Sequence, residues 1–257
     1  DGYPYRVFPL DRNPFNNAVP AYFYPSIGGY TGAKLSYYQD MIDELLFTGP
    51  SGLNVTILDM LNVKYITAGR ELPFDQFTEV YQGDNRRVFE NTQVLPKAFF
   101  VDSVANAGSA QEAIRMMHPD NRFDPSKYAV VESADPIETS NDPASSTVVT
   151  RYDNRHIYLE VNRSEPGFMV LSEIWYPEGW RAYIDGSETP IYKTNYILRG
   201  IEVPAGAHTI QFRFNPRSYT VGAKVAWAGN IIQWLLGMVL LAGFIWRKWN
   251  PPPEDES

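Results

Sequence analysis

A chain of 257 residues with 30 acidic and 22 basic side chains carries a formal net charge of −8. That balance excludes nucleic acid as a partner, because phosphate recognition needs a basic face and no run of Lys or Arg supplies one. Hydrophobic residues make up 44% of the chain and charged residues 20%, which is typical of a folded protein. The absence of cysteine excludes disulfides, Cys-ligated zinc and thiol catalysis.

The first half of the chain mixes helix and strand patterns. Apolar residues at helical spacing predict one helix over 33–47 and a second over 53–61. Ser109 followed by Glu112 has the spacing of a capping box and predicts a helix that runs to Met117. Strands are predicted over 63–66, 98–101 and 128–131, and a hairpin over 79–89. These patterns predict a small mixed α/β domain over residues 1–134.

Residues 135–146 are polar and contain two prolines, so we interpret them as a linker. Beyond them, apolar and polar side chains alternate, which is typical of strands with one buried face. The apolar sets are Ile157, Leu159 and Val161; Trp180, Ala182 and Ile184; and Ile210, Phe212 and Phe214. Turn residues separate these runs, which predicts an antiparallel β-sandwich over 147–220.

An uncharged stretch over residues 225–246 predicts a single transmembrane helix. About 22 residues reach roughly 33 Å as a helix, enough for a bilayer core of about 30 Å. Trp227 and Trp246 lie near its two ends, where interfacial aromatics are common. A buried core helix is the alternative. Because the last predicted strand leads almost directly into this stretch, we expect the sandwich to stand close to the membrane surface.

The flanking charges favour a cytoplasmic C-terminus and a bulk domain outside. Arg247 and Lys248 begin the short tail 247–257, and positive residues are most frequent on the cytoplasmic side. Three basic residues on the other side reduce this asymmetry: Arg213, Arg217 and Lys224. The first ten residues have neither the basic region nor the apolar core of a signal peptide. Export is therefore expected to depend on a removed signal or on upstream membrane helices.

Polar and small residues lie within the predicted membrane helix. Asn230 and Gln233 are polar, and Gly229 and Gly237 are small. Such residues often face another helix rather than lipid, so this set predicts packing against a partner helix. Alternatively, Asn230 lies shallow enough to meet water and lipid headgroups.

A set of turns and strand ends carries a family resemblance. In the second half the pieces are Tyr176-Pro177 with Gly179-Trp180, Ile184-Asp185-Gly186, Asn195, Arg199-Gly200 and Val203 to His208. Upstream pieces follow in the same order: Gly28-Gly29-Tyr30 with Ala33-Lys34, Leu61 to Ile66, and Pro96-Lys97-Ala98. Together they resemble the closing part of the bacterial YfhO-like membrane proteins, over roughly residues 28–222.

The resemblance implies a bacterial inner-membrane protein with its bulk domain in the periplasm. YfhO-like proteins are long polytopic chains, similar to multi-span glycosyltransferases that use lipid-linked sugar donors. Their catalytic acidic residues are expected in an early extracytoplasmic loop among N-terminal membrane helices. This chain has one predicted span and no such loop, so no catalytic residue can be carried over to it.

A direct search for chemistry finds weak signals. His118, His156 and His208 are far apart, and none has a second ligand at helical or strand spacing, so we predict no metal site and no cofactor. Carboxylates are plentiful. A glycosidase-like pair across a cleft is an alternative that sequence alone cannot place. Its candidates are Asp120, Asp124 and Glu132, and Glu173 with Asp185.

Aromatic side chains around residues 175–192 are the best binding candidates. Exposed aromatic faces can stack on sugar rings or on a protein partner. We place Trp175, Tyr176 and Tyr183 in this role, whereas Trp180 alternates with Ala182 and Ile184 and is expected in the core.

Three functions remain open from sequence. The first is a non-catalytic, membrane-anchored module, an accessory subunit of a larger membrane complex that acts as no enzyme by itself. The second is the C-terminal part of a polytopic YfhO-like glycosyltransferase, and the third is a glycan-binding module. The expected partners are the lipid bilayer, other membrane subunits and, under the third function, a glycan. The predicted class is α+β: a small α/β domain, an antiparallel β-sandwich and one C-terminal transmembrane helix.

Overall fold

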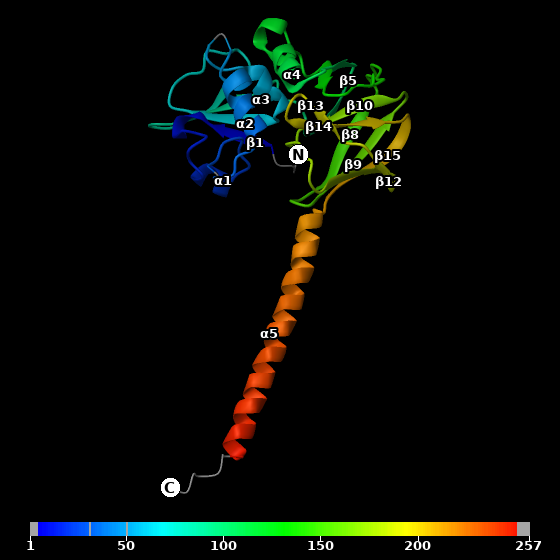
Figure 1. Cartoon of the computed structure of the whole chain (residues 1–257). Coiled ribbons are helices and arrows are strands. Elements are labelled where there is room, and N and C mark those ends of the chain that lie inside the picture. The colour runs from blue at the N-terminus through cyan, green and yellow to red at the C-terminus, as the bar shows by residue number, and fades with distance from the viewer. Residues whose placement is uncertain (1–4, 31, 50, 251–257) are drawn as a thin grey trace. The chain divides into compact units, whose positions relative to one another are not determined.

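The computed structural model describes residues 5–30, 32–49 and 51–250 (Figure 1). The chain divides into two compact units. The first comprises Asp1–Pro177 and Arg181–Phe214, and the second comprises Glu178–Trp180 and Asn215–Ser257. Strands dominate the first unit and one long helix dominates the second, which confirms an α+β chain with a C-terminal helix.

A four-stranded sheet opens the first unit, in the order β1-β2-β4-β3. Its strands are β1 (Arg6–Pro9), β2 (Val63–Ala68), β3 (Phe77–Gln82) and β4 (Arg87–Asn91). β3 and β4 pair antiparallel, which confirms the predicted hairpin. β1 pairs parallel with β2, and the sequence patterns had not predicted this strand.

Short helices accompany the sheets of the first unit (Figure 1). They are α1 (Val19–Phe23), α2 (Ser36–Met41) continued by a π-helical turn (Ile42–Leu46), α3 (Val55–Met60) and α4 (Ala110–Met117). Short 3-10 turns cover Leu10–Arg12 and Pro119–Asn121. The predicted helices over 33–47, 53–61 and 109–117 are confirmed, and each is one to four residues shorter than predicted. At α4 the Ser109 hydroxyl accepts from the Glu112 amide at 3.2 Å, so the predicted cap forms.

A six-stranded sheet, β5-β10-β14-β13-β7-β6, takes strands from both sides of residues 135–146. Its strands are β5 (Ala98–Val101), β6 (Ser103–Asn106), β7 (Tyr128–Val131), β10 (Gly167–Leu171), β13 (Tyr192–Thr194) and β14 (Leu198–Val203). β10 pairs antiparallel with both β5 and β14. Strands from the two predicted domains therefore share one hydrogen-bonded sheet, while the division at 135–146 stays a prediction.

The segment 135–146 packs along this sheet. Ile137 is buried, and the Thr139 hydroxyl donates to the Val101 carbonyl at 3.0 Å. The same hydroxyl accepts from the Phe168 amide at 3.0 Å. The segment thus contacts β5 and β10 together.

A five-stranded antiparallel sheet, β12-β11-β15-β9-β8, completes the first unit. Its strands are β8 (Ser146–Tyr152), β9 (His156–Arg163), β11 (Trp180–Ile184), β12 (Ser187–Thr189) and β15 (Gly206–Phe214). The predicted alternation is confirmed in β9 and β15, where Ile157, Leu159, Val161, Ile210 and Phe212 are buried. In β11 only Ala182 is fully buried, and Trp180 is half-buried. The prediction that Trp180 lies in the core is therefore wrong, because β11 lies beside the three-residue edge strand β12.

β10 shows why the core is continuous. All five of its residues are buried. Phe168 and Val170 belong to the large apolar cluster that also contains Phe8 of β1 and the buried apolar residues of α2 and α3. Met169 and Leu171 point to the opposite face, since side chains alternate along a strand. The six-stranded sheet is thus covered on both faces. The large apolar cluster lies on one face. The buried side of the five-stranded sheet covers the other, where β8 contacts β5.

α5 (Arg217–Trp249) forms most of the second unit. Its segment Val221–Arg247 is long and apolar enough to cross a membrane, and it contains the predicted span 225–246. None of its most apolar window is buried against the rest of the chain. A buried core helix was the alternative from sequence, and the exposure of this window favours a membrane span instead.

Candidate functional site

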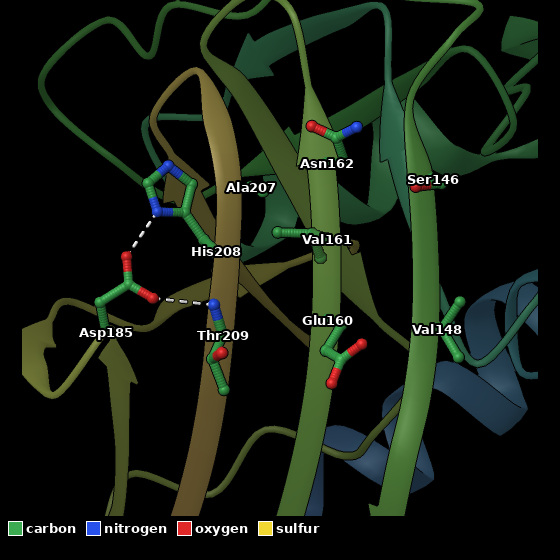
Figure 2. A pocket seen from close by; sticks show the side chains of 9 residues that line it. All are labelled: Ser146, Val148, Glu160, Val161, Asn162, Asp185, Ala207, His208 and Thr209. Carbon is green, nitrogen blue, oxygen red and sulfur yellow. Dashed lines mark hydrogen bonds and ion pairs between the residues drawn. The ribbon is translucent and has the colours of Figure 1, made fainter.

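A pocket of about 390 Å³ opens over β8, β9, β15 and the turn between β11 and β12 (Figure 2). Its lining comes mainly from the outward side of the five-stranded sheet. The residues are Ser146, Val148, Glu160, Val161, Asn162, Asp185, Ala207, His208 and Thr209. Because the pocket lies on a sheet surface, it can accept a ligand only as a shallow groove.

His208 and Asp185 close one side of this pocket (Figure 2). Nδ1 of His208 lies 2.6 Å from Oδ2 of Asp185, and Nε2 lies 3.1 Å from the Ala205 carbonyl oxygen. The hydrogen bond from His208 lowers the pKa of Asp185, and Asp185 raises the pKa of His208. Both ring nitrogens face acceptors, so the geometry favours an imidazolium that donates twice. Such a ring has no free nitrogen for proton abstraction.

The same carboxylate fixes a turn. Oδ1 of Asp185 accepts from the Thr209 amide at 2.8 Å. Asp185 and Gly186 both have positive φ, 50° and 86°, as a tight hairpin requires. The His208–Asp185 pair therefore holds the β11–β12 turn on β15, which is a structural task.

A second charged group lies in the interior. One oxygen of Glu173, Oε1, accepts from Arg6 at 2.9 Å, from Lys97 at 2.8 Å and from the Tyr152 hydroxyl at 2.8 Å. The nearby cations Arg6 and Lys97 outweigh burial and lower the pKa of Glu173 to about 2. Burial and Arg6 lower the pKa of Lys97 to about 8. Sequence reasoning missed this cluster because its members lie far apart in the chain.

Asp59 is a further titratable residue that the sequence analysis missed. It lines a pocket of about 480 Å³ and accepts from Asn91 at 2.6 Å and from Gln76 at 2.9 Å. Burial raises the pKa of Asp59 to about 6. A carboxylate between the buried residues Leu58 and Met60 was the available signal, since charge is rare on the apolar side of a helix.

The three predicted aromatic residues have separate neighbours. Trp175 packs edge-on against Tyr37, with ring centroids 6.1 Å apart. Tyr176 is 39% exposed and lies 6.4 Å from the Phe214 ring. Tyr183 lies 4.9 Å from the guanidinium of Arg213. None of the three lines the pocket of Figure 2.

Each histidine lies beside its own aspartate. His118 faces Asp120 at 3.2 Å and His156 faces Asp153 at 3.1 Å, as His208 faces Asp185. Within residues 5–30, 32–49 and 51–250, no group of three or more His, Cys, Asp and Glu could hold a metal ion.

The candidate carboxylates from the sequence have separate partners. Asp124 pairs with Lys127, Glu132 with Lys193, and Glu173 belongs to the interior cluster. Each of these carboxylates therefore serves a local contact of its own.

Residues 138–226 match the model of the family described as bacterial membrane protein YfhO. This part of the chain is YfhO-like. The match covers about a third of the chain, from the segment before β8 into the first third of α5. It includes the second-half pieces of the resemblance, from Tyr176 to His208, whereas the upstream pieces before residue 138 lie outside it. No curated protein and no solved structure matches the chain.

The resemblance residues of the YfhO-like part have local structural roles. Asn195 is buried at φ 46°, donates its amide to the Val130 carbonyl and accepts from the Val130 amide through Oδ1. Arg199 donates to the Ile174 carbonyl at 2.8 Å. A Cβ on Gly200 would overlap the Phe168 ring. These residues therefore specify turns and close packing.

The predicted packing residues of the candidate membrane helix all lie in α5, beyond the residues that match the family model. Gly229, Asn230, Gln233 and Gly237 are exposed in their own unit. At about 100° per residue they fall within one sector of about 100°. The bulky residues Ile231, Leu235 and Met238 fall on the opposite side of α5.

Proposed function

We propose that this membrane-associated, YfhO-like chain is a non-catalytic module whose globular unit lies outside the cytoplasm and whose α5 packs against other membrane subunits. The carrying observation is α5: a helix long enough to span, in which Gly229, Asn230, Gln233 and Gly237 fall within one sector. Small residues let helix backbones approach, and amide side chains bond across membrane helices. This surface is best explained by a partner helix.

The titratable groups support a structural task. His208 donates through both nitrogens, and one oxygen of Glu173 accepts from three donors. In each place the polar groups bind one another. Such arrangements stabilise a fold, whereas a general base needs a free lone pair directed at a substrate.

Co-purification with matched helix variants tests the partner. The full chain would be extracted from its own membranes in mild detergent and weighed by native mass spectrometry. We expect a stable assembly with other membrane proteins, lost in G229L/G237L and kept in A228L/A242L. The control adds the same bulk on the opposite side of α5. Recovery of the parent only as a single 29.2 kDa chain would contradict the proposal.

The orientation can be tested because the chain has no cysteine. Single cysteines at Ser187 in β12 and Asn250 after α5 would each be the only thiol. An impermeant maleimide added to spheroplasts should label S187C, and should label N250C only after lysis. The reverse pattern would place the globular unit in the cytoplasm.

The C-terminal part of a polytopic glycosyltransferase is the second candidate, favoured by the YfhO family match. In the same experiment, one mass far above 29.2 kDa that ends in these residues would support it. The catalytic groups would then lie in upstream membrane helices.

Contact with a glycan is the weakest proposal, and it rests on Tyr176, which keeps part of its ring exposed. Y176A should weaken binding to a glycan array without changing the melting temperature. Unchanged glycan binding by Y176A would remove this candidate.

A further inference from the structure

The outward side of the five-stranded sheet carries a row of cationic and aromatic side chains at the end of β15. The guanidinium of Arg213 lies 4.9 Å from the Tyr183 ring, and that of Arg151 lies 5.6 Å from the Tyr158 ring. The His156 ring lies 6.2 Å from the Tyr158 ring and is tilted 31° to it. These five residues, which we call the Arg–Tyr row, span the adjacent strands β11, β15, β9 and β8.

Strand register places the row on one side of the sheet. Arg213 lies directly opposite His156, and Tyr158 lies directly opposite Arg151. Directly opposed residues of antiparallel strands point to the same side. Their neighbours Ile157 and Phe212 are buried, so the row points outward.

Arg213 is the exposed cation of this row that lacks a carboxylate. Its contacts within the described residues are neutral: the side-chain amide of Gln211 and the ring of Tyr183. By contrast, Arg151 pairs with Asp153 at 2.8 Å, and the nearby Arg181 pairs with Glu188 at 3.3 Å. A guanidinium stacked on an aromatic ring keeps N–H donors at its edge, in the fork that suits phosphate oxygens.

Chain length holds this row near the membrane. Arg213 lies four residues before Arg217, the first residue of α5, and Val221 follows four residues later. Four extended residues reach at most about 14 Å, and four helical residues add about 6 Å. The backbone of Arg213 therefore stays within about 20 Å of the apolar segment in any orientation of the two units.

We propose that the Arg–Tyr row docks on anionic phospholipid headgroups of the leaflet beside it, with Arg213 binding the lipid phosphate. Tyrosine is enriched at the headgroup level, and anionic surfaces attract arginine within about a Debye length. The chain as a whole carries a net charge of −8, so an anionic membrane would repel the acidic rest of the protein and attract this surface. The proposal rests on membrane insertion of α5, but not on any partner subunit.

Headgroup quenching in nanodiscs tests the docking. The full chain would carry one cysteine, T209C on the outward side of β15, labelled with a fluorophore. Nanodiscs would contain phosphatidylcholine with a nitroxide on the headgroup, with or without phosphatidylglycerol. We expect stronger quenching with phosphatidylglycerol, reversed by high salt. Co-elution with the nanodisc reports insertion of α5 separately, so a failure of anchoring is distinguishable from a failure of docking.

Matched arginine variants decide the role of Arg213. R213Q should lower the phosphatidylglycerol-dependent docking constant about fivefold, because that is the contribution of one arginine near an anionic membrane surface. R115Q removes the same charge from exposed α4 and should leave quenching unchanged. Equal melting temperatures would exclude misfolding of R213Q. Quenching that is indifferent to phosphatidylglycerol, or equal in R213Q and the parent, would overturn the proposal.

Discussion

Arg6 and Glu173, which are 167 positions apart in sequence, form an ion pair of 2.9 Å inside the first unit. Lys97 and Tyr152 bond to the same carboxylate oxygen. Arg6 lies in β1, Lys97 precedes β5, Tyr152 ends β8 and Glu173 follows β10. One oxygen atom thus lies where the three sheets of the first unit meet.

Removing this charge should destabilise the globular unit strongly. E173Q would leave the cations Arg6 and Lys97 without a buried counter-charge, so we expect a loss of about 3–5 kcal/mol in unfolding free energy. E188Q removes an exposed partner of Arg181 and should cost less than about 1 kcal/mol. Chemical denaturation of the full chain in detergent, followed by circular dichroism, measures both. Equal losses in the two variants would contradict a special role for Glu173.

Acid should remove the same stabilisation. The pKa of Glu173 is lowered from 4.5 to about 2, so its contribution is fully present above about pH 4.5 and is lost as pH falls toward 2. The difference in unfolding free energy between the parent and E173Q should therefore shrink by up to about 3 kcal/mol over that window. A difference that stays constant from pH 5 to about 2.5 would show that the ion pair is not the cause.

Asp59 should behave in the opposite sense. Its pKa is raised from 3.8 to about 6 by burial, so its contribution to stability is present below about pH 3.8 and lost as pH rises through 6. D59N keeps an oxygen for Asn91 and Gln76 while it removes the charge. We expect D59N to be about 1–3 kcal/mol more stable than the parent at neutral pH, with no gain below about pH 4. Thermal unfolding at the two pH values is the measurement, and destabilisation at neutral pH would refute it.

Gly200 should not tolerate a methyl group. A Cβ there would overlap both the Phe168 ring and the Thr194 hydroxyl at a buried position of β14. We expect G200A to cost about 1–3 kcal/mol by overpacking. G69A, where a Cβ meets open space, is the matched control and should change stability by less than about 0.5 kcal/mol. If G200A were as stable as the parent, the backbone of β14 must shift enough to make room for the methyl group.

The charge of His208 can be measured directly. Because the chain has three histidines, a proton–carbon NMR titration should resolve each ring. The pKa of His208 should lie above 6.5 because Asp185 stabilises its charged form. D185N should lower it, while leaving the His118 titration curve unmoved. A His208 curve that is insensitive to D185N would show that the pair seen in Figure 2 does not persist in solution.

Local patterns were readable from sequence. The β3–β4 hairpin and the capped helix α4 depend on residues fewer than fifteen positions apart, and both were predicted. The alternation in β9 and β15 followed from one buried side of a sheet. The membrane helix followed from length and apolarity alone.

Long-range pairings were not readable. β1 and β6 are four-residue strands that pair parallel with β2 and β7, and such a pairing leaves no local signal in the sequence. The Glu173 cluster gathers donors from three sheets, so spacing could not suggest it. The packing of Trp175 against Tyr37 likewise joins residues 138 positions apart, where a hydroxyl-to-carbonyl bond also connects them.

The interleaved six-stranded sheet sets a condition on biosynthesis. β5 has all its own residues by Val101, but its neighbour β10 ends at Leu171 and the next strand, β14, ends at Val203. During translation β5 must therefore wait with an unpaired edge through the next 70 residues, until β10 is complete at Leu171. α5 begins only fourteen residues after β14, so the sheet can close only when the ribosome is already delivering the membrane helix. Folding of the globular unit and insertion of α5 become competing events in the same short interval, and a chaperone that shields strand edges would act on this chain before residue 203.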